Sequence, residues 1–152
     1  MSNLTFKRIF NSDLLTAKSV ISDALSFIAN RISTMTTDDY MDLKLIYTEL
    51  LVNAVIHGNK RDSSKHVMIS IKISGNTINT AISDEGNGFD YMHILQSIDN
   101  HNILSECGRG MKLVHTLVDS IVFNSTGNEI KFLKRVTSNE QNFNCGQLAS
   151  EY

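Results

Sequence analysis

Two long stretches of the chain repeat apolar residues at the three-to-four spacing of a helix with one buried face. The first begins after Ser12, which is placed as the N-cap, and continues to about Ile32. The second follows a polar break at residues 33–38 and stops at Gly58, a residue type that commonly ends helices. A shorter apolar stripe starts at Gly110. The pattern therefore predicts three helices.

Other segments alternate apolar and polar residues with a period of two, which is the pattern of a half-buried strand. The strands predicted in this way are residues 4–9, 67–73, 77–83, 121–123 and 130–133. Gly75-Asn76 connects the second strand to the third, and Ser125-Thr-Gly-Asn128 connects the last two. We therefore expect two β-hairpins.

The order of these elements, a strand, two helices, a hairpin, a helix and a second hairpin, predicts the α+β class. We expect a two-layer α/β sandwich with helices on one face of a mixed, mostly antiparallel sheet. The polar segment from Tyr91 to Asn102 is interpreted as a mobile cover over a site between helices and strand ends. Residues 1–136 would form the domain, and residues 137–152 a polar C-terminal tail.

Composition narrows the class of protein. With 152 residues, of which 41% are hydrophobic and 20% charged, the chain fits one ordinary soluble domain. Its formal net charge of -2 provides no overall positive field, so we expect no direct binding to nucleic acid. No apolar run approaches the length of a membrane span, and Cys107 and Cys145 are too few for a disulfide framework. We expect a cytoplasmic protein.

The second predicted helix carries a carboxylate and an amide on one face. Glu49 and Asn53 are four residues apart, which separates them by only about 40° around a helix, and His57 follows near the helix end. An amide oxygen is a hard ligand that suits Mg²⁺, and a carboxylate can deprotonate a nucleophile. The alternative is a solvated glutamate beside an incidental asparagine.

Asp84-Glu-Gly-Asn-Gly-Phe89 directly follows a predicted strand. Its two glycines allow the backbone to approach a planar ring, and Asp84 could accept a hydrogen bond from the exocyclic amine of adenine. The alternative is an ordinary tight turn, since Asp, Asn and Gly are common turn residues. The loop lacks the spaced ligands of a helix-loop-helix calcium site.

A second glycine pair, Gly108-Arg-Gly110, lies just before the third predicted helix. Unpaired N–H groups and the helix dipole favour a phosphate at such a position, and Arg109 could add charged contacts. A flexible connection is the alternative. The segment is not a Walker A loop, because no Gly-Lys-Ser/Thr ends it.

Taken together and in this order, the segments resemble the three sequence boxes of the GHKL ATPases. The N box is similar to Glu49 through Asn59, the G1 box to Asp84 through Phe89, and the G2 box to Gly108 through Leu113. The small size and the His-Gly-Asn ending of the first segment most resemble the bacterial anti-sigma-factor serine kinases. The resemblance covers residues 4–136.

The resemblance implies ATP and Mg²⁺ as ligands and assigns a role to each box. Glu49 would be the general base, Asn53 would hold Mg²⁺, and Asp84 would bind the adenine amine. The remaining residues that it places around the nucleotide are Gly86, Gly88, Phe89, Gly108, Arg109, Gly110 and Met111.

The same resemblance implies a function. Such kinases transfer the γ-phosphoryl group of ATP to a Ser or Thr of an anti-anti-sigma (STAS-type) protein and, as homodimers, sequester a sigma factor. Two alternatives stay open, a nucleotide-gated binding module without phosphoryl transfer and a related kinase that acts on a different regulatory protein. Glu49 favours an enzyme, because a clamp needs no base.

Overall fold

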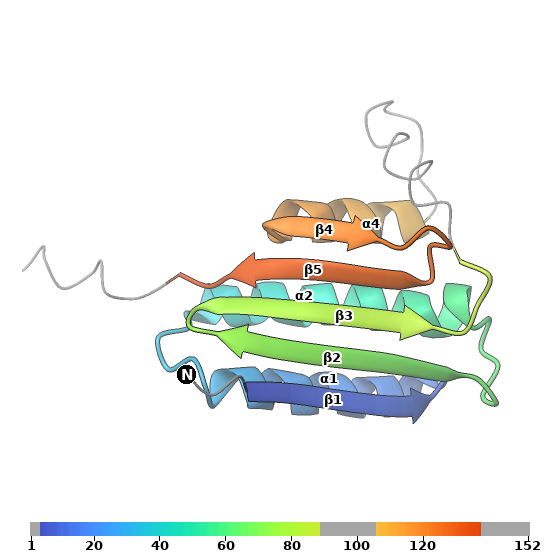
Figure 1. Cartoon of the computed structure of the whole chain (residues 1–152), viewed down its shortest axis with the longest axis horizontal. Coiled ribbons are helices and arrows are strands. Elements are labelled where there is room, and N and C mark those ends of the chain that lie inside the picture. The colour runs from blue at the N-terminus through green and yellow to red at the C-terminus, as the bar shows by residue number, and fades with distance from the viewer. Residues whose placement is uncertain (1–3, 89–105, 138–152) are drawn as a thin grey trace, which may run out of the picture.

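The computed structural model describes residues 4–88 and 106–137, which form one sheet covered by helices on one face (Figure 1). The strands are β1 (Leu4–Asn11), β2 (His66–Ser74), β3 (Thr77–Asp84), β4 (Ser120–Phe123) and β5 (Glu129–Arg135). Their order is β1-β2-β3-β5-β4, and every neighbouring pair is antiparallel. The predicted two-layer α+β sandwich is confirmed, with an entirely antiparallel sheet among these strands.

The helical layer lies behind the sheet in Figure 1 and carries α1 behind β1, α2 behind the central strands and α4 behind β4. Its elements are α1 (Leu14–Ala29), α2 (Thr37–Asn53), the π-helix η1 (Ala54–Gly58) and α4 (Glu106–Leu117). The core lies between the layers, where fully buried side chains of α2 meet those of the sheet. These side chains include Leu43, Ile46, Tyr47, Ile69, Ile71 and Ile78.

The helix starts follow from side-chain capping. Asp13 caps α1, because its carboxylate accepts a hydrogen bond from the Thr16 N–H at 2.9 Å. The prediction of Ser12 as the cap is wrong, because Ser12 precedes the capping residue and its side chain is buried. Thr36 caps α2 and forms a reciprocal capping box with Asp39.

A buried lysine ties the last helix to the rest of the fold. Lys134 of β5 points into the core side of the sheet, and its ammonium donates to the carbonyl oxygen of Leu117 at 2.8 Å. It also lies 3.4 Å from Asp42 of α2. Lys134 therefore provides a hydrogen bond to a carbonyl group at the C-terminus of α4, and its positive charge is balanced by the carboxylate of Asp42 in α2.

The predicted cover at Tyr91–Asn102 lies outside the described residues, as does nearly all of the predicted tail. Within the described part of the chain, no helix is long and apolar enough to cross a membrane.

Candidate active site

The carboxylate of Glu49 lies against the backbone of Gly110. Helix α2 carries Glu49 and packs on α4, which carries Gly110. A Cβ atom at Gly110 would be only 2.0 Å from Glu49 Oε2, so the two residues fit together because position 110 has no side chain. Two segments that are 61 positions apart in the sequence thus meet at one point.

Asn53 lies one turn beyond Glu49, at the end of α2. Its side chain is only 6% exposed, and among the described residues its Nδ2 has no hydrogen-bond partner. Leaving a buried amide unsatisfied costs about 1–3 kcal/mol. Among the described residues, no group satisfies this buried donor.

The π-helix brings the end of α2 under the end of β3. In η1 the N–H of Asn59 donates to the carbonyl oxygen of Ala54 at 2.8 Å, five residues back, which widens the helix by one residue. Gly58 then lies so close to Asp84 that a Cβ atom on it would be 2.4 Å from Asp84 Oδ2. The segment from Glu49 to Asn59 is therefore in direct contact with the loop that begins at Asp84.

Asp84 is a partly buried carboxylate with one oxygen committed to the protein. Its Oδ1 accepts a hydrogen bond from the Gly86 N–H at 2.8 Å. Burial raises the pKa of Asp84, and this effect outweighs the lowering by the Gly86 N–H and by the positive charge of Lys65. A carboxylate in such surroundings is a strong acceptor for an N–H donor of a ligand.

Both glycines of the Asp84 loop are packed against protein backbone. A Cβ atom at Gly86 would be 2.0 Å from the carbonyl oxygen of Gly58, and one at Gly88 would be 1.6 Å from that of Thr126. Gly88 also has a φ of +88°, which favours glycine. The loop is therefore fixed between η1 and the β4–β5 turn. Phe89, the last residue of this predicted segment, lies outside the described residues.

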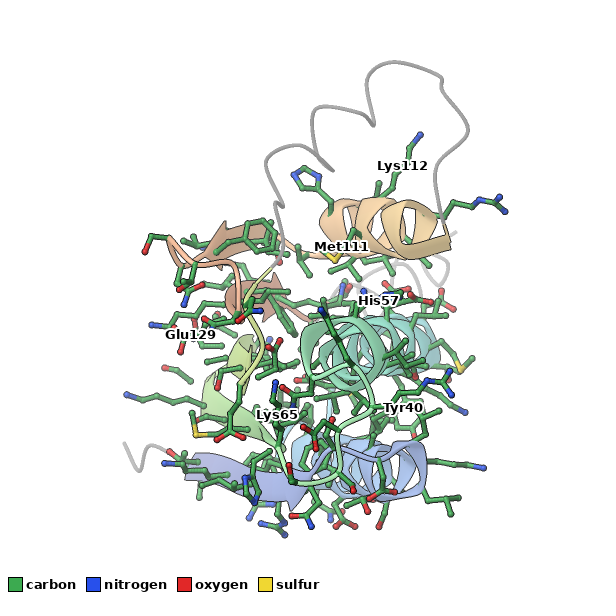
Figure 2. All side chains as sticks on the ribbon, turned by 90° about the vertical axis from the view of Figure 1, so that its right-hand side faces the viewer. Tyr40, His57, Lys65, Met111, Lys112 and Glu129 are labelled. Carbon is green, nitrogen blue, oxygen red and sulfur yellow. The ribbon has the colours of Figure 1, made fainter. Side chains whose placement is uncertain are left out.

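The third segment differs from its prediction. Gly108, Arg109 and Gly110 were expected in a loop ahead of a helix, but α4 begins at Glu106 and contains all three. Arg109 is exposed, whereas Met111 is fully buried in the core. Figure 2 shows Met111 on the side of α4 that faces the body of the protein and Lys112 on the opposite side.

Comparison with known proteins fits this geometry. The model of the histidine kinase-like ATPase domain matches residues 10–134. This chain belongs to that family. The serine-protein kinase RsbW of Bacillus subtilis is 32% identical to it over 122 residues, which cover 76% of each chain. RsbW of Staphylococcus epidermidis is 34% identical over 72% of this chain and 74% of its own, and the anti-sigma F factor of Anoxybacillus flavithermus is 27% identical over 69% and 75%.

All three box-like segments lie inside the range that matches the histidine kinase-like ATPase family. The resemblance to these ATPases is thereby confirmed at the level of the family. The roles that the resemblance gave to single residues, from Glu49 to Met111, stay predictions. The geometry adds that Glu49 meets Gly110 and that Gly58 meets Asp84.

One residue of this family domain was missed by the sequence analysis. Asn59 is 0% exposed, its Nδ2 donates to the His66 carbonyl oxygen at 2.9 Å, and its Oδ1 accepts from the Glu85 N–H at 2.8 Å. It therefore joins the end of η1 to β2 and to the residue that follows Asp84 at the end of β3. The His-Gly-Asn ending was the available signal, but the spacing gave no partner for the asparagine.

Proposed function

We propose that this chain is an ATP-dependent serine/threonine protein kinase and anti-sigma factor, which phosphorylates an anti-anti-sigma protein and sequesters a sigma factor. The observation that carries the proposal is the contact between Glu49 and Gly110, because it sets a carboxylate beside the segment expected to hold the phosphates. The names of the relatives, serine-protein kinase RsbW and anti-sigma F factor, support the same function.

The adenine end of the site would be at Asp84. Its Oδ1 already accepts the Gly86 N–H, which leaves Oδ2 for the exocyclic amine of adenine. Asn59 holds the neighbouring Glu85 backbone in place, so Asp84 does not have to be ordered when the nucleotide binds.

The chemistry of Asn53 fits Mg²⁺. The atom of its buried amide that lacks a partner among the described residues is Nδ2, and turning the amide by 180° would place Oδ1 at that position instead. An amide oxygen is a hard ligand, and Mg²⁺ in such sites takes most of its other ligands from phosphates and water. When bound, the ion would neutralise charge on the phosphates during transfer.

Glu49 would act as the general base. Its carboxylate would accept the proton of the partner's serine or threonine hydroxyl, while the hydroxyl oxygen bonds to the γ-phosphorus and the bond from that phosphorus to the bridging oxygen of ADP breaks. Gly110 would fix the position of Oε2, because the glycine surface is in contact with it.

Two substitutions separate binding from transfer. Asn53→Ala should abolish Mg²⁺-dependent ATP binding in calorimetry, because no other described side chain replaces its oxygen. Glu49→Ala should bind ATP normally and lose transfer of radiolabel to a purified anti-anti-sigma protein. Leu45→Ala, at an exposed position of the same helix, is the matched control for both measurements. Wild-type transfer by both active-site variants would refute the assignments.

The rival is a nucleotide-gated clamp that binds its partner without phosphoryl transfer. Wild-type protein that binds ATP and a sigma factor but transfers no label to any anti-anti-sigma protein of the same genome would favour this clamp. Label transfer only to another regulatory protein would favour the related kinase with a different target. Sedimentation of the purified chain tests the proposed homodimer, and fractionation of cells tests the proposed cytoplasmic location.

A further inference from the structure

A groove runs between α1 and α2 on the solvent side of the helical layer. It encloses about 530 Å³ and is lined mainly by apolar side chains. The apolar residues along it are Leu14, Ala17, Ile21, Leu25, Tyr40 and Val52. Figure 2 labels Tyr40 on the side of the helices away from the sheet, so this groove is remote from the sheet's open face.

Apolar side chains are also exposed on these two helices outside the lining of the groove. Helices α1 and α2 also expose Leu15 (83%), Met41 (48%) and Leu45 (42%). An apolar groove whose helices carry further exposed apolar side chains is a candidate place for another segment to bind. Two cations, Lys18 and Lys44, stand among the groove residues, so the complementary segment should be apolar and acidic.

The chain itself contains such a segment. Residues 138–152 read Ser-Asn-Glu-Gln-Asn-Phe-Asn-Cys-Gly-Gln-Leu-Ala-Ser-Glu-Tyr, with three large apolar residues, Phe143, Leu148 and Tyr152. The segment has two glutamates, Glu140 and Glu151, and no lysine or arginine. It also lies beyond residue 134, where the match to the family domain ends.

The last described residue is bonded to α2, the helix that forms one wall of the groove. The N–H of Thr137 donates to Asp39 Oδ2 at 3.1 Å, and its hydroxyl lies 3.4 Å from Asp39 Oδ1. Asp39 directly precedes Tyr40, which lines the groove. Residues 138–152 could span on the order of 50 Å at ~3.3 Å per residue. The groove follows α1, whose 16 residues extend only about 24 Å.

We propose that residues 138–152 bind in the groove between α1 and α2 of the same chain. Their apolar side chains cover the exposed surface of the helices, and their glutamates lie near Lys18 and Lys44. Because the segment is tethered at Thr137, its effective concentration at the groove is high without a large interface. While it is bound, it excludes any other protein from this face.

Cys145 makes the proposal testable in the full chain. Cys107→Ser leaves Cys145 as the only native thiol, and a second thiol is added at the groove edge by Ser22→Cys or, in a separate variant, Thr48→Cys. The matched control is Ser70→Cys, on the outer face of the sheet. Each protein is treated with a short bismaleimide at low concentration, and cross-linked peptides are quantified by mass spectrometry.

The groove thiols should cross-link to Cys145 at least about tenfold faster than the sheet thiol, which corresponds to ~1.4 kcal/mol of preferential binding. Reversing both groove charges, Lys18→Glu with Lys44→Glu, should slow the reaction, and Glu140→Lys with Glu151→Lys should restore it. Equal rates for groove and sheet thiols, products that join two chains, or a reaction unaffected by charge reversal would each overturn the proposal.

Discussion

Gly110→Ala places a methyl group where the carboxylate of Glu49 now lies. The new Cβ would be 2.0 Å from Oε2 and 2.8 Å from the carboxyl carbon, whereas ordinary contact begins at 3.4 Å. The carboxylate is the far end of a flexible side chain, so it can retreat by more than about 1 Å while the backbone stays in place. The fold should therefore tolerate the change, but Glu49 should lose its position.

Gly110→Ala should have opposite effects on folding stability and on the rate of phosphoryl transfer. Alanine in place of glycine within a helix gains about 0.5–1 kcal/mol, which offsets the adjustment of Glu49. A displacement of about 1 Å of a catalytic group costs roughly 100-fold in rate, or ~2.7 kcal/mol of activation free energy. We expect a Gly110→Ala protein with unchanged or slightly higher resistance to urea and with strongly reduced phosphoryl transfer.

The assay combines urea unfolding, ATP calorimetry and label transfer for Gly110→Ala, Glu49→Ala and the double variant. If the methyl group acts through the carboxylate, adding Gly110→Ala to Glu49→Ala should cause no further loss of transfer, because the group it displaces is already absent. Losses that multiply in the double variant, or wild-type transfer by Gly110→Ala, would refute the positional role of this contact.

Two further predictions concern the hairpin end of the site. Asp84→Asn should be more stable than wild type near pH 7 and should bind ATP more weakly. The stability gain follows because the raised pKa of Asp84 means that folding disfavours its charged form. The gain should disappear as pH falls below about 3.8, where the carboxyl is protonated in both the folded and the unfolded state. Urea unfolding across pH measures this, and an advantage that persists in acid would contradict it. Asn59→Ala should lower the unfolding free energy by about 1–3 kcal/mol, because it removes two part-buried hydrogen bonds of a fully buried side chain. Asn79→Ala, at an exposed strand position, is its control, and equal effects would contradict the role of Asn59.

Periodicity predicted the elements well because most of the helix and strand faces are buried as regular stripes. The alternation in residues 67–73 corresponds to Val67, Ile69 and Ile71 in the core, and the apolar stripe after Gly110 corresponds to buried Met111 and Val114. Element ends were harder to predict. Both Ser12 and Asp13 are good caps, and the choice of Asp13 depends on the burial of its neighbour, which the sequence does not show.

The start of α4 was missed for a related reason. Two glycines in three residues normally weaken a helix by about 1 kcal/mol each, so a loop was the local expectation. The structure continues the helix through Gly108 and Gly110 because α4 packs on α2, and at position 110 only glycine leaves room for Glu49. Local propensity is overridden by a contact between distant segments. The hydrogen-bond partners of Asn59, His66 and Glu85, could not be predicted for the same reason, because only the fold brings them to Asn59.

The π-helical turn η1 changes the direction in which side chains point before and after it. Straight α-helical geometry would rotate every residue after Ala54 by one position, about 100° around the axis, and would turn Asn59 away from the hairpin. The extra residue therefore lets the Glu49 end of the helix face Gly110 of α4 while the Asn59 end faces the β2–β3 hairpin. Removing one residue between Ala54 and Gly58 would leave both ends intact and misalign them with each other.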